Sequence, residues 1–165
     1  MVATLYHTST IQRFDMKGIG YLDYCKDRLD EGHKTQKTKD GTGYEEAGQE
    51  RFVLYFGRSH IKDFETGVMA RGELKIGQAK FLSAVMRSRN QPGNDFRCYV
   101  EIVLSSTLET YEAEGIVKKL YKGRRVQLTQ NQQELYNIKD EELEDVVNFV
   151  VTKLPFKPKE IKYYV

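Results

Sequence analysis

Apolar residues in the middle of the chain are spaced as in β-strands. Residues 52–56 form a continuous aromatic and β-branched run closed by Gly57, which is typical of a buried strand. Residues 73–76 predict a second short strand that ends at Gly77, and residues 96–104 predict a third with apolar side chains on both faces. Because the first two strands are close in sequence, we expect them to pair antiparallel in a small sheet.

Helical patterns alternate with these strands. In residues 81–89 apolar side chains recur at helical spacing. Ser106 and Glu109 form a capping box, which predicts the start of a second helix that ends at Gly123. Residues 140–154 carry apolar side chains every three or four positions and predict the last helix. The sequence therefore predicts an α+β fold, with a small, three-stranded, mainly antiparallel sheet flanked by helices.

Both ends of the chain differ in composition from this middle part. Residues 30–50 are mostly Gly, Lys, Thr, Gln, Asp and Glu, so they bury too little surface to order themselves. We expect residues 1–50 to form a partly flexible N-terminal extension and residues 51–154 to form the folded domain. Residues 155–165 predict a basic, tyrosine-rich tail on the surface.

The overall composition narrows the class of protein. A chain of 165 residues is long enough for one ordinary domain. It has no run near the roughly 18 apolar residues of a membrane span and no signal-peptide pattern, which predicts a cytoplasmic protein without a membrane partner. Two cysteines are too few for a disulfide framework or a zinc cluster. Because the net charge is only +2, a nucleic-acid-binding surface must be a local basic patch.

Four side chains suited to phosphodiester chemistry lie on successive predicted elements: Tyr55, Lys75, Arg87 and Glu114. With their neighbours they resemble the motifs of the GIY-YIG nuclease superfamily, in particular its phage-type branch whose second motif reads KIG. The matching segments are Val53-Leu54-Tyr55, Lys75-Ile76-Gly77, Glu114-x-x-x-Lys118 and the closing Glu134-Leu135-Tyr136. The resemblance covers roughly residues 51–154 and predicts a phage-encoded endonuclease, a hydrolase that acts in the host cytoplasm.

The resemblance also implies a role for each of these side chains. Tyr55 is expected to act as the general base or to orient the attacking water, and Arg87 to neutralise the scissile phosphate. Glu114 is expected to hold a single Mg²⁺ ion, for which Mn²⁺ is a possible substitute. Lys75 is expected to lower the pKa of the Tyr55 phenol or to contact the nucleophile.

Each of these residues also has an ordinary structural interpretation. Tyr55 fits a core position, Lys75 fits protection of a strand edge, and Glu114 fits an ion pair with Lys118 one turn later. The chain also departs from the family pattern: the first motif lacks its glycine, and the connection between its two motifs is longer than usual.

Two positions in the predicted site have an alternative. The arginine lies later in its helix than the pattern expects, so Arg89 is an alternative to Arg87. Glu112 is likewise an alternative to Glu114.

Basic residues predict DNA as the partner. Those expected to contact it are Arg89, Arg97, Lys118, Lys119, Lys122, Arg124 and Arg125. They would track the phosphate backbone, although the same cations at the end of a helix also complement its dipole. We expect a monomer or a homodimer. The alternative function is a non-catalytic nucleic-acid-binding or protein-interaction module on a degenerate GIY-YIG scaffold.

Overall fold

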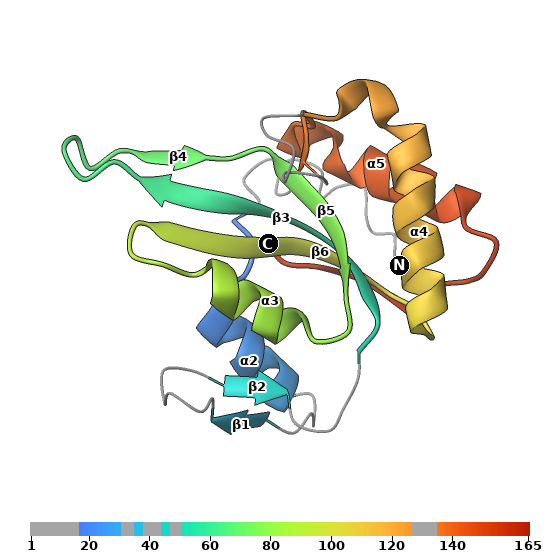
Figure 1. Ribbon diagram of the computed structural model, residues 1–165, viewed down its shortest axis with the longest axis horizontal. Helices are drawn as coiled ribbons and strands as arrows, with labels where there is room; N and C mark the ends of the chain where they lie inside the picture. The colour runs from blue at the N-terminus through green and yellow to red at the C-terminus, as the bar shows by residue number, and fades with distance from the viewer. Residues whose placement is uncertain (1–16, 31–34, 38–43, 47–50, 127–134) are drawn as a thin grey trace.

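The computed structural model describes residues 17–30, 35–37, 44–46, 51–126 and 135–165 (Figure 1). Much of the predicted N-terminal extension lies outside these residues, as does most of the polar Gln- and Asn-rich loop before the closing strand. None of the helices in the described ranges is long and apolar enough to cross a membrane.

One antiparallel sheet of six strands organises the molecule, with strand order β7-β5-β3-β6-β8 and β4 paired to β3. The strands are β3 (Val53–Lys62), β4 (Met69–Arg71), β5 (Leu74–Ala79), β6 (Asn94–Val103), β7 (Leu135–Tyr136) and β8 (Glu160–Tyr163). The predicted α+β class and the antiparallel sheet flanked by helices are confirmed. The prediction of three strands is wrong, because β4, β7 and β8 are too short to show an alternating pattern of apolar residues.

The first long strand, β3, does not end at Gly57 as its sequence indicated, but continues to Lys62. At Gly57 the register between β3 and β6 shifts by one residue, and Tyr99 of β6 has no partner opposite it. A Cβ atom at Gly57 would lie 2.6 Å from Cζ of Phe96. The glycine therefore marks a bulge in a continuing strand, where the neighbouring ring crosses the backbone.

Helices cover both faces of the sheet (Figure 1). They are α2 (Tyr21–Asp30), α3 (Leu82–Arg89), α4 (Thr107–Leu120) and α5 (Asp140–Lys153), with a short 3₁₀ turn η1 (Lys122–Arg124) after α4. A separate two-stranded sheet joins β1 (Thr35–Lys37) to β2 (Tyr44–Glu46). The start predicted for α4 is confirmed, since Ser106 Oγ accepts a hydrogen bond from the Glu109 amide (3.2 Å).

Two apolar clusters lie on the opposite faces of the sheet. Leu54 and Phe56 pack with residues of α4 and α5. Val53 and Tyr55 pack with residues of α2 and α3. Successive side chains of a strand point to opposite faces, which is why Tyr55 lies in the layer of α2 and α3.

A buried carboxylate on β6, Glu101, joins α2 and the segment after β8 to the sheet. It accepts hydrogen bonds from the hydroxyls of Tyr24 on α2 (2.7 Å) and Tyr164 after β8. The guanidinium groups of Arg51 (3.4 Å) and Arg28 (3.9 Å) lie beside it. Burial, together with the adjacent Glu101, raises the pKa of Tyr164. Helix α2 and the segment after β8 are thus part of the same folded body as the sheet.

The long connection between the two sequence motifs is a hairpin formed by the far half of β3 and by β4. It projects from the body of the molecule (Figure 1). Its exposed apolar side chains are Ile61, Phe64, Val68 and Met69. The additional length therefore extends away from β5 and leaves the pairing of β3 with β5 intact.

Candidate functional site

The two central motifs of the predicted site lie side by side on paired strands. Tyr55 of β3 is directly opposite Gly77 of β5. A Cβ atom at Gly77 would lie 2.9 Å from Oη and 3.0 Å from Cζ of Tyr55, so the phenol lies across the glycine. The Tyr55 side chain is only 2% exposed. The Lys-Ile-Gly motif therefore ends in glycine for a physical reason: any larger residue would displace the Tyr55 hydroxyl.

Lys75 lies two residues before Gly77, so it is on the same face of β5 as the glycine. It is half-buried, and β7 pairs with β5 at this position through Leu135. Protection of a bare strand edge therefore does not explain this lysine. From Ile76 to Ala79 the outer edge of β5 has no strand beside it among the described residues.

The two candidate arginines occupy the last turn of α3. Arg87 is half-buried and follows the buried Ser83 by one turn. Arg89 is exposed, and its guanidinium carbon lies 5.7 Å from the centre of the Phe96 ring. That ring makes an edge contact with Tyr55 at a centroid distance of 6.2 Å. Both arginines therefore belong to the layer that covers Tyr55.

The candidate metal ligand is on α4, which a polar contact attaches to β5. The Thr110 hydroxyl donates to the Thr107 carbonyl within the helix (2.7 Å) and also lies 3.3 Å from Gln78 Oε1. Glu114 lies one turn after Thr110 on the same flank, with its side chain 14% exposed and 3.7 Å from Lys118 Nζ. Glu112 is exposed and, at 100° per residue, points well away from this flank. The geometry favours Glu114 over Glu112 as the residue near β5.

These residues come from two layers of the molecule. Tyr55 and the arginines of α3 are on one face of the sheet, whereas Glu114 is on a helix that packs on the other face. The strand between the two layers is β5, and the described residues place no strand beside its outer edge beyond Lys75. The predicted site residues therefore lie on both sides of this strand.

A complete metal cage is absent from the part of the chain that the structure describes, since no group of three His, Cys, Asp or Glu side chains is placed to hold an ion. A single carboxylate such as that of Glu114 still fits Mg²⁺, which usually retains several waters and takes one or two carboxylates together with substrate phosphates. Glu114 is thus the residue that would hold the ion, in competition with Lys118.

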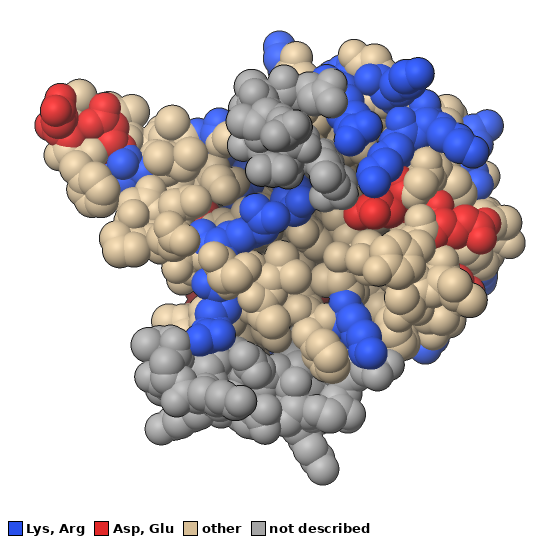
Figure 2. All heavy atoms as spheres, viewed as in Figure 1, with Lys and Arg blue, Asp and Glu red and all other residues tan. Residues whose placement is uncertain are grey.

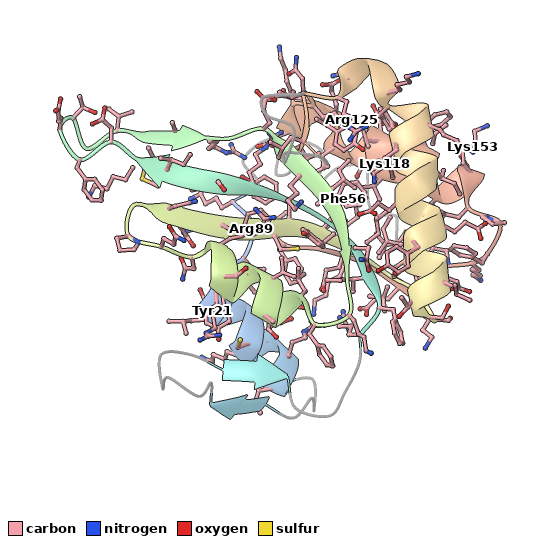
Figure 3. All side chains as sticks on the ribbon, in the orientation of Figure 1. Tyr21, Phe56, Arg89, Lys118, Arg125 and Lys153 are labelled. Carbon is pink, nitrogen blue, oxygen red and sulfur yellow. The ribbon has the colours of Figure 1, made fainter. Side chains whose placement is uncertain are left out.

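Basic side chains gather around the C-terminal end of α4 and η1 (Figure 2). Lys118 and Arg125 are labelled there in Figure 3, and Lys119 and Lys122 are exposed. A second, sparser group of cations crosses the middle of the sheet toward α3, where Arg89 lies (Figures 2 and 3).

Besides Lys118, which pairs with Glu114, two of the predicted DNA contacts have charged partners within the chain. Arg124 Nη2 donates to both carboxylate oxygens of Glu142 (2.9 and 2.7 Å), and Arg97 Nε donates to Asp95 (2.8 Å). The hydrogen bond from Arg124 holds the pKa of Glu142 below its usual range. Arg124 therefore anchors η1 to the start of α5.

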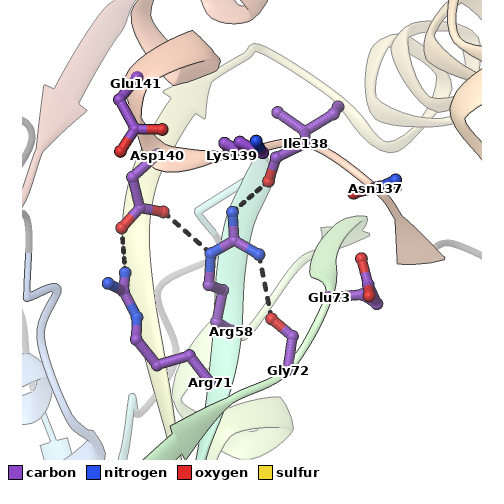
Figure 4. Close-up of a pocket in the computed structure, with 9 residues that line it drawn as sticks. All are labelled: Arg58, Arg71, Gly72, Glu73, Asn137, Ile138, Lys139, Asp140 and Glu141. Atoms are coloured by element: carbon purple, nitrogen blue, oxygen red, sulfur yellow. Dashed lines mark hydrogen bonds and ion pairs between the residues drawn. The ribbon is translucent and has the colours of Figure 1, made fainter.

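A polar pocket of about 330 Å³ lies where the start of α5 meets β3 and β4 (Figure 4). Arg58 donates to Asp140 Oδ1 (2.9 Å), to the Gly72 carbonyl (3.0 Å) and to the Ile138 carbonyl. Arg71 donates to the same aspartate. All three nitrogens of the Arg58 guanidinium are engaged, so its role is to fix the start of α5 against β3. Sequence reasoning missed this cluster, because no motif links a strand arginine to an aspartate so far along the chain.

The polar cluster continues to a histidine on β3. His60 Nε2 and Tyr99 Oη are 2.7 Å apart, and Arg71 also donates to this hydroxyl. Burial and the charges of Arg71 and Arg97 lower the pKa of His60. The lowered pKa favours the neutral imidazole, which shares one hydrogen bond with the Tyr99 hydroxyl.

No family model, curated protein or solved structure matches this chain. The motifs and their geometry therefore carry the functional argument without support from relatives.

Proposed function

We propose that this protein is a metal-dependent DNA endonuclease that hydrolyses phosphodiester bonds. The observation that carries the proposal is the placement of the Tyr55 phenol across Gly77, because it joins the two central motifs in space. The attachment of α4 to β5 through Thr110 and Gln78 adds support, since it places the Glu114 flank at the same strand.

In this proposal each side chain has a separate task. The Tyr55 hydroxyl takes a proton from the attacking water or orients it, with Lys75 as the nearby cation that favours the phenolate. Arg87 offers forked donors to the phosphate oxygens. Glu114 holds a Mg²⁺ ion, which when bound stabilises charge on the leaving oxygen. The basic residues at the end of α4 hold the DNA backbone.

Plasmid nicking tests the proposal. Purified protein is incubated with supercoiled DNA at low salt, with Mg²⁺ or Mn²⁺ and with EDTA. We expect nicking with metal only, and a loss of about 100-fold or more in Tyr55→Phe, Arg87→Ala and Glu114→Gln. Glu112→Gln is the matched control on the same helix as Glu114 and is expected to retain activity. A Glu114→Gln variant as active as the wild type removes that residue from the mechanism.

A second function is favoured by one observation. Tyr55 is almost fully buried, as a core tyrosine is. This burial fits a non-catalytic nucleic-acid-binding module. In that case the protein shifts DNA in a salt-dependent way, and no divalent metal produces nicking.

A further inference from the structure

Two exposed apolar residues of α4 precede Glu114 in the helix. Tyr111 lies beside the flank of Glu114, and Leu108 lies further round, one turn before Glu112. Leu108 is 80% exposed and Tyr111 is 56% exposed. Tyr111 is three residues before Glu114, and Lys118 is four residues after it, so the three side chains follow one another along the helix. Figure 3 shows Lys118 on the side of α4 toward β5.

The order of these groups matches the parts of a nucleotide strand. The Glu114 carboxylate and Lys118 Nζ are 3.7 Å apart, so a metal ion held by Glu114 would lie next to a phosphate neutralised by Lys118. Tyr111 is about 4.5 Å before Glu114 along the helix axis. Its ring is therefore placed to meet a base beside the phosphate at Glu114.

Leu108 and Tyr111 are not part of the face of α4 that packs on the core. The residues of α4 that face the core are Thr110, Ala113 and Val117. Tyr111 lies outside that stripe, and Leu108 lies further round the helix. An aromatic ring with a free face is the feature that proteins use to stack unpaired bases, because every base has a π-face.

We propose that Tyr111, with Leu108 beside it, forms a platform on which an unpaired nucleobase stacks next to the scissile phosphate. Single-stranded or locally open DNA is then the preferred substrate over intact duplex. The inference rests on the proposed function, since it takes DNA as the ligand of this surface. Duplex DNA keeps its bases stacked on one another, so it gains only the phosphate contacts of the lysines.

Binding in EDTA tests the platform independently of cleavage. Fluorescence anisotropy measures the affinity for a labelled single strand and for the matched duplex at one fixed low salt concentration. We expect wild type to prefer the single strand, and Tyr111→Ala to bind it about 5- to 100-fold more weakly with duplex binding unchanged. Tyr111→Phe keeps the ring and is expected to bind as wild type does. Phe149→Ala, which truncates an exposed aromatic on α5, is the matched control.

A second readout reports stacking itself. A single strand that contains 2-aminopurine changes its fluorescence when that base stacks on a ring, and this change is expected to disappear in Tyr111→Ala but not in Phe149→Ala. If Tyr111→Ala binds single-stranded DNA with the same affinity as the wild type, the stacking platform is refuted and the proposed function stands. A wild-type protein that binds neither form of DNA overturns both.

Discussion

The Glu101 cluster yields a quantitative prediction about stability. Glu101 has no exposed surface, and it faces the guanidinium groups of Arg28 and Arg51. The substitution Glu101→Gln keeps the size of the side chain and an oxygen that accepts the Tyr24 hydroxyl. It removes the negative charge between two buried cations, and arginine cannot lose its proton to compensate.

The magnitude follows from the burial of these groups. Breaking a buried ion pair by removing one partner costs about 3–5 kcal/mol. Because glutamine retains part of the hydrogen bonding, we expect the lower end, about 3 kcal/mol. Domains of ordinary stability have about 5–15 kcal/mol in total, so the loss is a large fraction. For a chain of this size the melting temperature should fall by about 6–12 °C.

Urea denaturation followed by circular dichroism measures this loss, since the chain has no tryptophan to report unfolding by fluorescence. The matched control is Glu160→Gln. Glu160 also contacts Arg51 (3.5 Å), but its side chain is 47% exposed, so its loss should cost less than about 1 kcal/mol. If Glu101→Gln is no less stable than Glu160→Gln, the carboxylate does not hold α2 and the segment after β8 to the sheet.

Three further predictions follow from single groups. Gly77→Ala should abolish nicking while leaving the melting temperature within a few degrees of wild type, because its Cβ atom displaces the Tyr55 hydroxyl; unchanged nicking would refute that geometry. The pKa of His60 is lower in the folded protein than in the unfolded chain. The neutral imidazole therefore contributes its full stability above about pH 6.5, and this contribution is lost as the pH falls toward the folded pKa. His60→Gln should flatten the pH dependence of the free energy of unfolding, measured in urea, over that range. Cys25 and Cys98 are both buried, and burial raises the pKa of the Cys98 thiol. A thiol reagent should therefore label neither cysteine in the native protein and both in denaturant. Rapid labelling of the native protein would contradict the packing of α2 on β6.

Local patterns were sufficient to predict the main elements of the fold. The two-residue period of residues 96–104 and the helical spacing of residues 140–154 correspond to β6 and α5. The pair Ser106 and Glu109 placed the start of α4 correctly. These signals succeed because each depends on residues a few positions apart, where backbone geometry alone sets the pattern.

The attachment of α2 and of the segment after β8 could not be predicted in this way. A glutamate within a strand indicates a solvent-facing position, whereas Glu101 lies under α2 and the segment that follows β8. Its partners Tyr24 and Tyr164 are far from it in sequence. No local pattern connects a buried charge to the groups that neutralise it when they are so far apart in the sequence.

For the candidate site, the order of the motifs in the sequence predicted that the first two strands pair. It did not predict on which face of the sheet each candidate residue lies. Once β3 and β5 pair antiparallel, the register sets Tyr55 opposite Gly77, and the lack of a side chain at Gly77 admits the ring. The position of Glu114 depends on how α4 packs on the sheet, to which its buried residues Ala113 and Val117 contribute. These contacts join residues far apart in the sequence, which no local pattern predicts.

The open edge of β5 is the feature on which the proposed chemistry depends. Tyr55 is buried and its ring lies across Gly77, so the proposal requires a substrate to reach its hydroxyl from the side of β5 that lies away from β3. The flank of α4 with Glu114 lies near the same strand. Because β7 pairs with β5 only as far as Lys75, no strand lies along the rest of that edge in the described part of the chain. A longer β7 would close this approach while leaving every candidate residue in place, so the shortness of that strand is itself part of the proposed site.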